Sequence, residues 1–476
     1  MEAKEAVWSM GDDAPPAFIS STRRTLWDYC KQRFAQVTNP PIDPLREAQV
    51  MSLEANLGGK IALGSPLLDA GQLAAIEKLA RRPGHASLLR IDIGYEAAKG
   101  VQGALAALHQ IRGTLLEHSG SPAQQPGFVL LSDYSVCEER AALPALLAIS
   151  AAWKQMVNGG LCEVPLIIET GQAIETHHIA LLIAAGASAV SPYLALEFSE
   201  ALKSGGAARY RVAVESGLRK VLARMGISTV ASYRNSQLFE IVGLDPELCE
   251  EFFEDASAAL GGKKLAELLE ESLERHLRAY IPRAQALQDL GLYRFRQGAE
   301  QHASSPEFVR RIQKFVESPG PEPYRAMASL AESREPVAVR DLLEVINSAP
   351  VPIEEVEDAT SILRRFSTQA MSLGALSAEA HRVLAIGMNR LGARSNTGEG
   401  GEDPELYIRE PEATNRVKQV ASARFGVTAE YLVRADELEI KMAQGSKPGE
   451  GGQLPAAKVT AYIARLRHAT PGMALI

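Results

Sequence analysis

Cysteine and aromatic residues are scarce in this sequence. Its four cysteines are scattered, with no C-x-x-C spacing between any two of them: Cys30, Cys137, Cys162 and Cys249. That scatter excludes a zinc site or an iron–sulfur ligand run made from these residues, and a disulfide-dense scaffold. We expect reduced thiols, with Cys137 and Cys162 as small core residues. Aromatic residues make up only 6%, whereas Ala, Leu and Gly are abundant, which favours helices packed on a parallel sheet over a β-sandwich.

Long apolar runs and excess positive charge are also missing. The longest nearly apolar run, residues 179–190, is too short to span a bilayer, and the first residues lack the apolar stretch of a signal peptide. Fifty Lys and Arg against 58 Asp and Glu give a net charge of −8, without the broad positive field of a non-specific nucleic-acid binder. We therefore expect a cytoplasmic protein that binds neither membranes nor nucleic acid.

The length of 476 residues and the 46% hydrophobic content predict two to four globular domains. Prolines at 15, 16, 40, 41 and 44 predict an extended N-terminal arm over residues 1–50, with a short helix around 26–37. In the region 51–345, short apolar runs alternate with stretches of helical periodicity, which predicts βαβ units. The expected strands are residues 87–93, 127–131, 164–168, 187–190 and 227–231. The expected helices are 143–157, 174–185 and 211–225, and residues 246–340 are expected to be helical throughout.

Polar residues follow these strands, at Asp133, residues 169–178 and Tyr193, where the carboxyl ends of parallel strands present ligand-facing loops. Within them, His177 and His178 are adjacent and project about 100° apart on a helix, which favours a packed or surface pair over a metal site. The glycines of residues 58–64 lack the spacing of a phosphate-binding loop.

A second βα series occupies residues 346–476. We expect a strand-like segment at 366–373, a helix at 378–391, a glycine-rich loop at 396–402, an apolar run at 438–442, a second glycine-rich loop at 445–453 and a helix at 455–468. Two or three βα units cannot close a barrel, so the sequence predicts an incomplete TIM-type (β/α) barrel. The fold class is α/β.

The two glycine-rich loops are the strongest candidates for a site. Glycines let backbone amides approach an anion closely, and three cations, Lys441, Lys447 and Arg467, surround the second loop, where a dicarboxylate or phosphate would fit. The alternative is a pair of solvated turns. Glu399 and Glu402 could supply a general acid or be solvated loop ends, and Arg394 could bind an anion or cap a helix.

Four long segments, residues 366–374, 390–404, 418–428 and 440–455, closely resemble the start of the FMN-binding synthase domain of the glutamate synthase large subunit. Residues 36–44, 225–234 and 291–296 resemble the central domain of that family. The resemblance implies reductive amination of 2-oxoglutarate to glutamate with ammonia from glutamine, with reduced FMN as the hydride donor. It places Met371, Ser372, Leu373 and Gly374 against FMN and assigns the 2-oxoglutarate to Lys441, Lys447, Gln453 and Arg467, with Glu399 or Glu402 beside it.

Departures from the family pattern qualify this expectation. The family's N-terminal cysteine amidotransferase domain, the rest of the barrel, the iron–sulfur cysteines and the C-terminal β-helix have no counterpart in the sequence, and Gln369 and Leu373 replace the family's usual residues beside the flavin. We expect the isolated chain to be inactive and to need chains that carry the glutaminase domain and the remaining barrel. The alternative is a non-catalytic structural or binding fragment of the same family. The electron donor, a nicotinamide or ferredoxin, is left open.

Overall fold

The computed structural model describes residues 13–33, 44–81, 87–120, 125–281, 289–292, 294–347, 349–420, 426–441 and 454–475. The chain divides into two compact units, unit 1 (residues 1–35 and 44–344) and unit 2 (residues 36–43 and 345–476). Among the described helices, none combines the length and apolarity that a membrane span requires.

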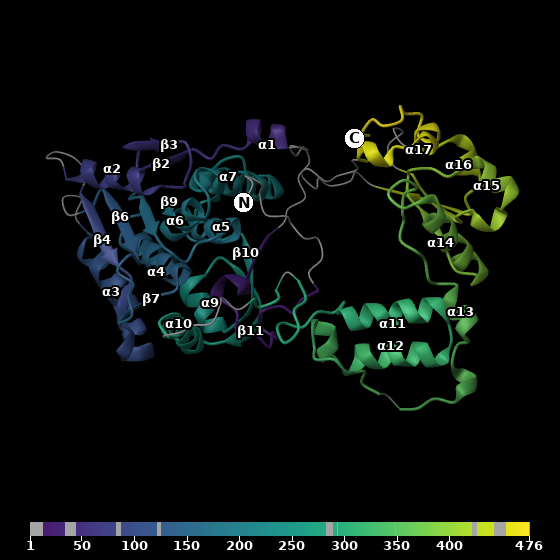
Figure 1. The fold of residues 1–476 in the computed structure, drawn as a ribbon, viewed down its shortest axis with the longest axis horizontal. Helices are drawn as coiled ribbons and strands as arrows, with labels where there is room; N and C mark the ends of the chain where they lie inside the picture. The colour runs from purple at the N-terminus through teal and green to yellow at the C-terminus, as the bar shows by residue number, and fades with distance from the viewer. Residues whose placement is uncertain are drawn as a thin grey trace. The chain divides into compact units, whose positions relative to one another are not determined.

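A four-stranded parallel sheet forms the centre of unit 1 (Figure 1). Its strands lie in chain order: β4 (Leu88–Asp92), β6 (Phe128–Ser132), β8 (Leu166–Glu169) and β9 (Ala189–Ser191). Leu89 lies opposite Val129, which lies opposite Leu166. The four strands predicted between residues 87 and 190 are thereby confirmed, as are the βαβ crossovers that parallel strands need.

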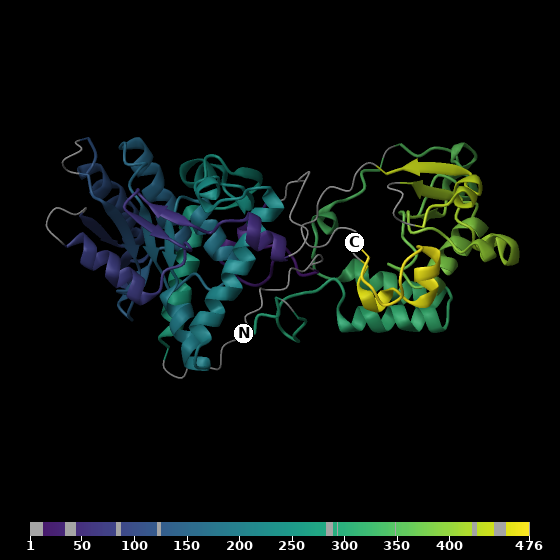
Figure 2. The ribbon, with the colours of Figure 1, turned by 90° about the horizontal axis from the view of Figure 1, so that it is seen from above.

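Helices cover both faces of this sheet (Figure 2). Alternate residues of each strand point to opposite faces, and because both sets are apolar, both faces have to be buried. Val129 and Leu131 pack into the larger core, with α3 (Gly100–Glu117), α4 (Ala145–Asn158) and α5 (Thr176–Ala184). Phe128 and Leu130 pack into a smaller core with α2 (Ala70–Ala80) and the hairpin of β2 (Ala55–Leu57) and β3 (Ile61–Leu63). The predicted helices 143–157 and 174–185 correspond to α4 and α5 and are confirmed.

Residues 13–33 pack into unit 1 through a second sheet. The 3-10 helix η1 (Leu26–Tyr29) leads into β1 (Cys30–Gln32), which runs antiparallel to β10 (Phe239–Leu244), and β10 runs parallel to β11 (Ser257–Lys263). The predicted helix over residues 26–37 is therefore wrong. Helical periodicity there ends at Tyr29 because the next residues pair with a strand more than 200 positions away, and Cys30 is fully buried in that contact.

Two further sequence predictions for unit 1 are wrong. Residues 227–231 contain the start of α8 (Val230–Tyr233), where the Thr229 hydroxyl accepts a hydrogen bond from Ser232 N at 3.3 Å, rather than a strand. The stretch from residue 246 is not helical throughout, because β11 lies between α9 (Pro246–Phe252) and α10 (Leu265–Ala279). The other elements are α1 (Pro44–Val50), β2 (Ala55–Leu57), β3 (Ile61–Leu63), β5 (Gly94–Glu96), η2 (Ala97–Lys99), β7 (Arg140–Ala142), α6 (Tyr193–Leu202), α7 (Gly206–Met225) and η3 (Val339–Leu342).

Two helices near the end of unit 1, α11 (Pro306–Glu317) and α12 (Pro321–Ser333), lie side by side (Figure 1). Each has a proline in its first turn, where a missing N–H costs nothing, and Ser305 caps α11 by accepting a hydrogen bond from Phe308 N at 3.2 Å. The rings of Phe315 and Tyr324 meet between the helices at a centroid distance of 6.0 Å.

The cysteines and the adjacent histidines take different environments. Cys137 and Cys162 are exposed, so their prediction as core residues is wrong; Cys30 and Cys249 are the buried pair. Burial raises the pKa of the Cys249 thiol to about 11. His178 stacks on Trp27 with ring centroids 4.7 Å apart, and burial, followed by the charge of His177, lowers its pKa to about 3. The predicted packing of this histidine pair is confirmed.

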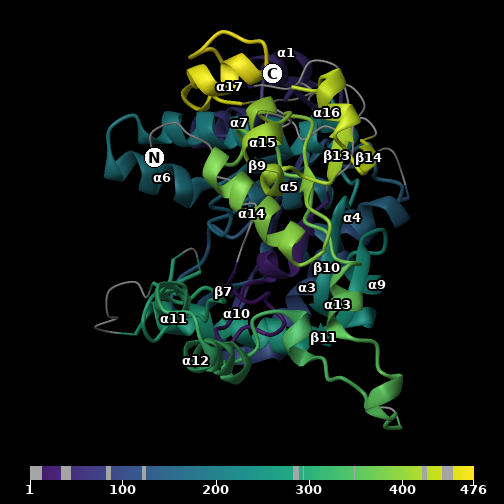
Figure 3. The same cartoon turned by 90° about the vertical axis from the view of Figure 1, so that its right-hand side faces the viewer.

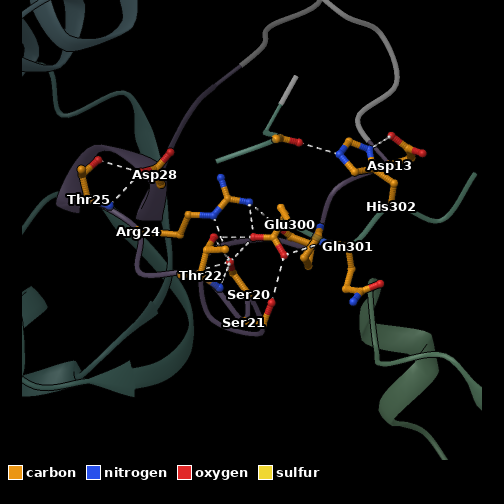
Figure 4. A network of polar contacts seen from close by, with 12 residues as sticks. Asp13, Ser20, Ser21, Thr22, Arg24, Thr25, Asp28, Glu300, Gln301 and His302 are labelled. Atoms are coloured by element: carbon orange, nitrogen blue, oxygen red, sulfur yellow. Dashed lines mark hydrogen bonds and ion pairs between the residues drawn. The ribbon is translucent and has the colours of Figure 1, made fainter. Parts of the chain in front are cut away.

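A buried acidic side chain, Glu300, fastens the N-terminal segment to the end of unit 1 (Figure 4). It is 1% exposed and accepts hydrogen bonds from the hydroxyls of Ser20 and Thr22 and from Arg24 Nη2, the last at 3.1 Å. Burial raises the pKa of Glu300, but these donors outweigh it and the net shift is downward. The contacts span some 280 residues of sequence, so this carboxylate closes a long loop.

Unit 2 contains a three-stranded parallel sheet in the order β12 (Asn396–Thr397), β13 (Val417–Val420) and β14 (Glu437–Ile440); Figure 3 shows β13 and β14 side by side. The predicted helix 378–391 is confirmed as α14 (Ala378–Arg390), whereas 455–468 divides into η6 (Ala456–Lys458) and α17 (Ala461–Leu466). The other elements are η4 (Ile353–Glu355), α13 (Ala359–Leu363), α15 (Pro404–Arg409), η5 (Pro411–Ala413) and α16 (Ala429–Val433). Strands alternating with helices confirm the α/β class.

Replacing Glu300 by Gln tests the fastening. The folded-state pKa of Glu300 is depressed, so its contribution is full above the unfolded value of 4.5 and is lost as the pH falls through the folded value. We expect Glu300→Gln to lower the free energy of unfolding by about 3 kcal/mol at pH 7, because Arg24 remains buried without its partner. Urea unfolding at pH 7 and below pH 4.5 should show this difference and then its loss. Equal stability of the parent and Glu300→Gln at pH 7 would contradict a fastening role for Glu300. The control is Glu322→Gln on α12, whose side chain is 86% exposed and whose loss should leave the stability unchanged.

Candidate functional site

The carboxyl ends of the unit 2 strands bring several predicted site residues together. The segment 366–373 runs parallel to β12 through the bridges Ser367 to Arg394 and Met371 to Thr397. The loop 398–402 leaves the end of β12, and Lys441 follows the end of β14. In parallel βα folds this edge carries the functional loops, so the first glycine-rich loop occupies the expected position.

Buried His381 of α14 connects the first two segments. Its Nε2 lies 2.8 Å from the Thr397 hydroxyl, and its ring also hydrogen-bonds the backbone of Met371. Burial lowers the pKa of His381, with Lys418 adding to this shift and Glu402 opposing it. The neutral ring therefore braces residue 371 against β12. Gly398 N adds a hydrogen bond to Met371 O at 3.2 Å.

Glycine is required in the loop 398–402 because other chain segments approach its backbone. A Cβ on Gly400 would lie 2.6 Å from Arg467 Nη2, and one on Gly398 would clash with the Ser372 hydroxyl. Gly401 has φ +82° and its Cα lies against the backbone of Gly426. These close approaches hold the loop against the segment 371–374.

Glu399 lies among the predicted cations. Its side chain is 8% exposed, and its Oε1 lies 2.7 Å from Lys441 Nζ. Arg467, 8% exposed, is close enough to Glu399 for their charges to interact, and burial lowers its pKa while Glu399 opposes that shift. Arg467 Nη2 also donates to Leu373 O at 2.7 Å. One carboxylate and two cations therefore meet where the loop passes the segment 371–374.

Glu402 points away from those cations and into the interior. Its Oε1 accepts hydrogen bonds from Asn415 N at 2.9 Å and Asn415 Nδ2 at 2.7 Å, and its Oε2 accepts from the Tyr407 hydroxyl at 3.2 Å. Oε2 also pairs with Lys418 Nζ, and the two side chains are 3% and 0% exposed. Both carboxylate oxygens are thus occupied by donors within the protein.

Lys418 lies on β13 and is enclosed by aromatic rings. Its ammonium lies 5.2 Å from the ring centroid of Tyr407 and 5.3 Å from that of Tyr431. Burial lowers the pKa of Lys418, and the carboxylate of Glu402 opposes that shift. The Tyr431 hydroxyl lies 3.1 Å from Gly398 O and 2.9 Å from Gln419 O, which ties the glycine-rich loop to the same strand.

The structure thus assembles part of the predicted site. Glu399, Lys441 and Arg467 come together next to the segment 371–374, while Glu402 does not join them. Lys447 and Gln453 lie outside the described residues. Arg394 forms an exposed ion pair with Glu437 at 2.9 Å. Within the described ranges, no three His, Cys, Asp or Glu side chains gather in a way that could hold a metal ion.

Sequence reasoning missed two sets of groups: Tyr407, Asn415 and Lys418, which contact Glu402, and His381 and Tyr431, which hold the segment 371–374 and the glycine-rich loop in place. The available signal was Lys418 itself, a lysine between valines in a short strand-like run, since a lysine in a buried strand needs a carboxylate partner. A cavity of about 210 Å³ next to these residues is lined by His381, Glu402 and Tyr407, among others.

These features define an α/β protein whose charged loops meet at the carboxyl ends of parallel strands. Residues 1–245 match the glutamate synthase central domain, and residues 302–476 match a conserved region in glutamate synthase. The chain belongs to the glutamate synthase family, which confirms the resemblance described above.

Two curated relatives match the whole chain. One is the ferredoxin-dependent glutamate synthase of Pyropia yezoensis, which is 40% identical over an alignment of 536 residues. The alignment covers all of this chain and 34% of the length of that protein. The other is the glutamate synthase [NADPH] large chain of Azospirillum brasilense, which is 40% identical over an alignment of 503 residues. That alignment covers all of this chain and 33% of the length of that protein. The chain thus spans about a third of the length of these relatives. A mandelate oxidase mutant solved with an FMN adduct aligns with 44% of this chain and 87% of its own, at 9% identity and a TM-score of 0.28, too low to support any argument.

Lys418→Met tests the buried pair. Removing the ammonium leaves Glu402 buried as an unpaired charge, so we expect the stability of unit 2 to fall by about 3 to 5 kcal/mol. The double variant Lys418→Met/Glu402→Gln should regain part of that loss, because the uncompensated charge is gone.

Hydrogen exchange of the β12 and β13 amides reports this stability for unit 2 separately from unit 1. Lys458→Met on η6 is the control, since Lys458 is exposed in the same unit. Exchange in Lys418→Met that matches the control would show that the pair does not hold the sheet together.

Proposed function

We propose that this chain is part of a glutamate synthase that reductively aminates 2-oxoglutarate, with ammonia derived from glutamine, and that it works with chains carrying the glutaminase domain and the remaining barrel. Residues 51–345 act as the central-type domain, the N-terminal arm of residues 1–50 packs on it over residues 13–33, and residues 346–476 open the FMN-binding barrel. The observation that carries the proposal is the meeting of Glu399, Lys441 and Arg467 beside the segment 371–374.

The two cations suit the two carboxylates of 2-oxoglutarate. Lys441 is 26% exposed in its side chain, so its ammonium can reach a ligand while it stays near Glu399. Arg467 is fixed by Leu373 O and contributes positive charge from a buried position. Lys447 and Gln453 complete the substrate contacts in this proposal, as the resemblance implies.

Of the two candidate acids, the proposal assigns the proton transfer to Glu399. Glu402 already accepts from Asn415, Tyr407 and Lys418, which leaves its oxygens no room for a substrate. Glu399 lies on the loop next to the cations and has a single described carboxylate contact, to Lys441. Its carboxylate therefore lies beside the position of a substrate bound to Lys441, within reach of a proton transfer.

The segment 371–374 fits one edge of a flavin site. Met371 and Ser372 are partly exposed, whereas Leu373 is buried against Leu454 and Ile463, and the backbone of Gly374 has φ +105°. Gly398 and Gly400 keep the adjacent loop free of side chains. Reduced FMN, when bound, would supply the hydride and be oxidised to FMN. This chain's residues would orient the acceptor and exclude water, which is worth several kcal/mol relative to an unoriented encounter.

A flavin titration tests the proposal against a non-catalytic scaffold. We expect the visible spectrum of FMN to shift when this chain is mixed with a chain that carries the remaining barrel of a relative, because the two together enclose the ring. Flavin bound in neither the mixture nor the isolated chain would support the scaffold instead. Ser372→Tyr places a bulky side chain where Ser372 already lies against the backbone of Gly398, and it is expected to abolish the shift.

Glu399→Gln tests the proton transfer. In the reconstituted enzyme we expect kcat for 2-oxoglutarate amination to fall by about 100-fold or more, with KM changed less than about threefold, because the group acts in the transition state rather than in substrate binding. Glu405→Gln on α15 is the matched control, with an exposed carboxylate in the same unit. An unchanged kcat would remove Glu399 from the reaction.

A further inference from the structure

A cavity in unit 1 lies at the carboxyl end of its parallel sheet, away from the residues used above. It measures about 380 Å³ and takes its lining from three parts of the unit. Asp133 and Gln172 follow β6 and β8, Trp27 comes from η1, and Arg275 comes from α10. The end of an open parallel sheet is where ligands bind in α/β folds, but nothing in the proposed function uses this position.

The floor of the cavity is polar and fixed. Asp133 is 2% exposed and accepts hydrogen bonds from the Thr170 hydroxyl at 2.6 Å, Gly171 N at 3.0 Å and Gln172 Nε2 at 3.3 Å, with Tyr193 as a further donor. Gln172 in turn donates to the carbonyl of residue 143 at 2.8 Å. These donors satisfy the carboxylate, so the floor gives shape and does not call for a charged ligand.

The walls are apolar. They are formed by Leu26, Trp27, Val136, Ala142, Pro144, Leu146 and Leu194. Trp27 is held from behind, because its carbonyl lies 3.0 Å from His177 Nε2 and its ring stacks on His178. The network of Glu300 in Figure 4 fixes the chain just before it, at residues 20–24. The wall is thus preformed, as small-molecule sites usually are.

The exposed rim carries a cation with spare donors. Arg275 makes one hydrogen bond, from Nη1 to Arg24 O at 3.5 Å, and has no carboxylate within ion-pair distance among the described residues. The charges of Glu271 and Asp28 act on Arg275, but both carboxylates have other partners. Glu271 pairs with Lys263 at 2.7 Å, and Asp28 accepts hydrogen bonds from the amide and the hydroxyl of Thr25. His276, also on the rim, lies 3.1 Å from the carbonyl of residue 138 through Nε2.

We propose that this cavity binds a small monocarboxylate whose apolar body rests on Trp27 and Leu146 and whose carboxylate pairs with Arg275. A guanidinium with free N–H groups can hold a carboxylate through two parallel hydrogen bonds. The apolar walls exclude phosphates and sugars, which have no apolar body to bury. The site belongs to unit 1 alone and does not depend on the chemistry proposed for unit 2.

Phenylacetate and its neutral isostere phenylacetamide are the probes for this site in the full chain. Because Trp27 lines the cavity, phenylacetate should change the tryptophan fluorescence saturably and raise the unfolding temperature. Trp27→Phe should remove the fluorescence change while calorimetric binding persists, which separates Trp27 from Trp8 and Trp153. No saturable binding of phenylacetate would overturn the proposal, as would a fluorescence change that survives in Trp27→Phe.

Arg275→Gln should weaken phenylacetate binding at least tenfold and leave phenylacetamide binding unchanged. Arg278→Gln, the same change on the same helix but outside the cavity lining, should behave like the parent. If Arg275→Gln does not fold, Val136→Trp provides the second test, because it fills the cavity and leaves the guanidinium in place; it should abolish binding. Unchanged phenylacetate affinity in either folded variant would overturn the assignment.

Discussion

The buried ion pair between Lys418 and Glu402 is the contact on which the candidate site depends. Burying two charges is costly unless each finds a partner and further hydrogen bonds, and here Asn415 and Tyr407 supply those bonds while two aromatic rings enclose the ammonium. Glu402 is on the glycine-rich loop and Lys418 is on the neighbouring strand. The pair therefore fixes the end of the loop at Glu402, three residues after Glu399, whose carboxylate lies 2.7 Å from Lys441 Nζ.

Glycine and charge act together in this loop. The backbone at Gly398 and Gly400 has to lie against Ser372 and Arg467, and any side chain there would push the segment 371–374 away. Arg467 closes the arrangement, since it bonds Leu373 O and interacts with Glu399. Unit 1 uses the same principle at Glu300, where one buried carboxylate joins segments far apart in sequence.

The sequence predicted the parts of the fold that depend on local pattern. The β4, β6, β8 and β9 strands are short apolar runs between helical stretches, and periodicity found each of them within about two residues. β1 was missed because it pairs with β10, more than 200 residues away in the sequence. β11 was missed because it is exposed along most of its length and carries no apolar pattern. Cys137 and Cys162 were misplaced because residue type alone does not indicate burial. At the candidate site, charge and glycine content pointed to Glu399, Lys441 and Arg467, which the structure brings together. The pattern did not distinguish Glu399 from Glu402, because the partner of Glu402, Lys418, lies on another strand.

Substrate discrimination in the reconstituted enzyme is the most direct measure of whether these cations hold a dicarboxylate. The relevant quantity is the ratio of kcat/KM for 2-oxoglutarate to that for 2-oxobutyrate, which lacks the second carboxylate, in the parent and in Lys441→Gln. If Lys441 binds that carboxylate, the ratio should fall by about 30-fold, the equivalent of about 2 kcal/mol for one charge-assisted contact. A ratio unchanged by Lys441→Gln would contradict the account, because the cations would then hold the loop together without recognising the substrate.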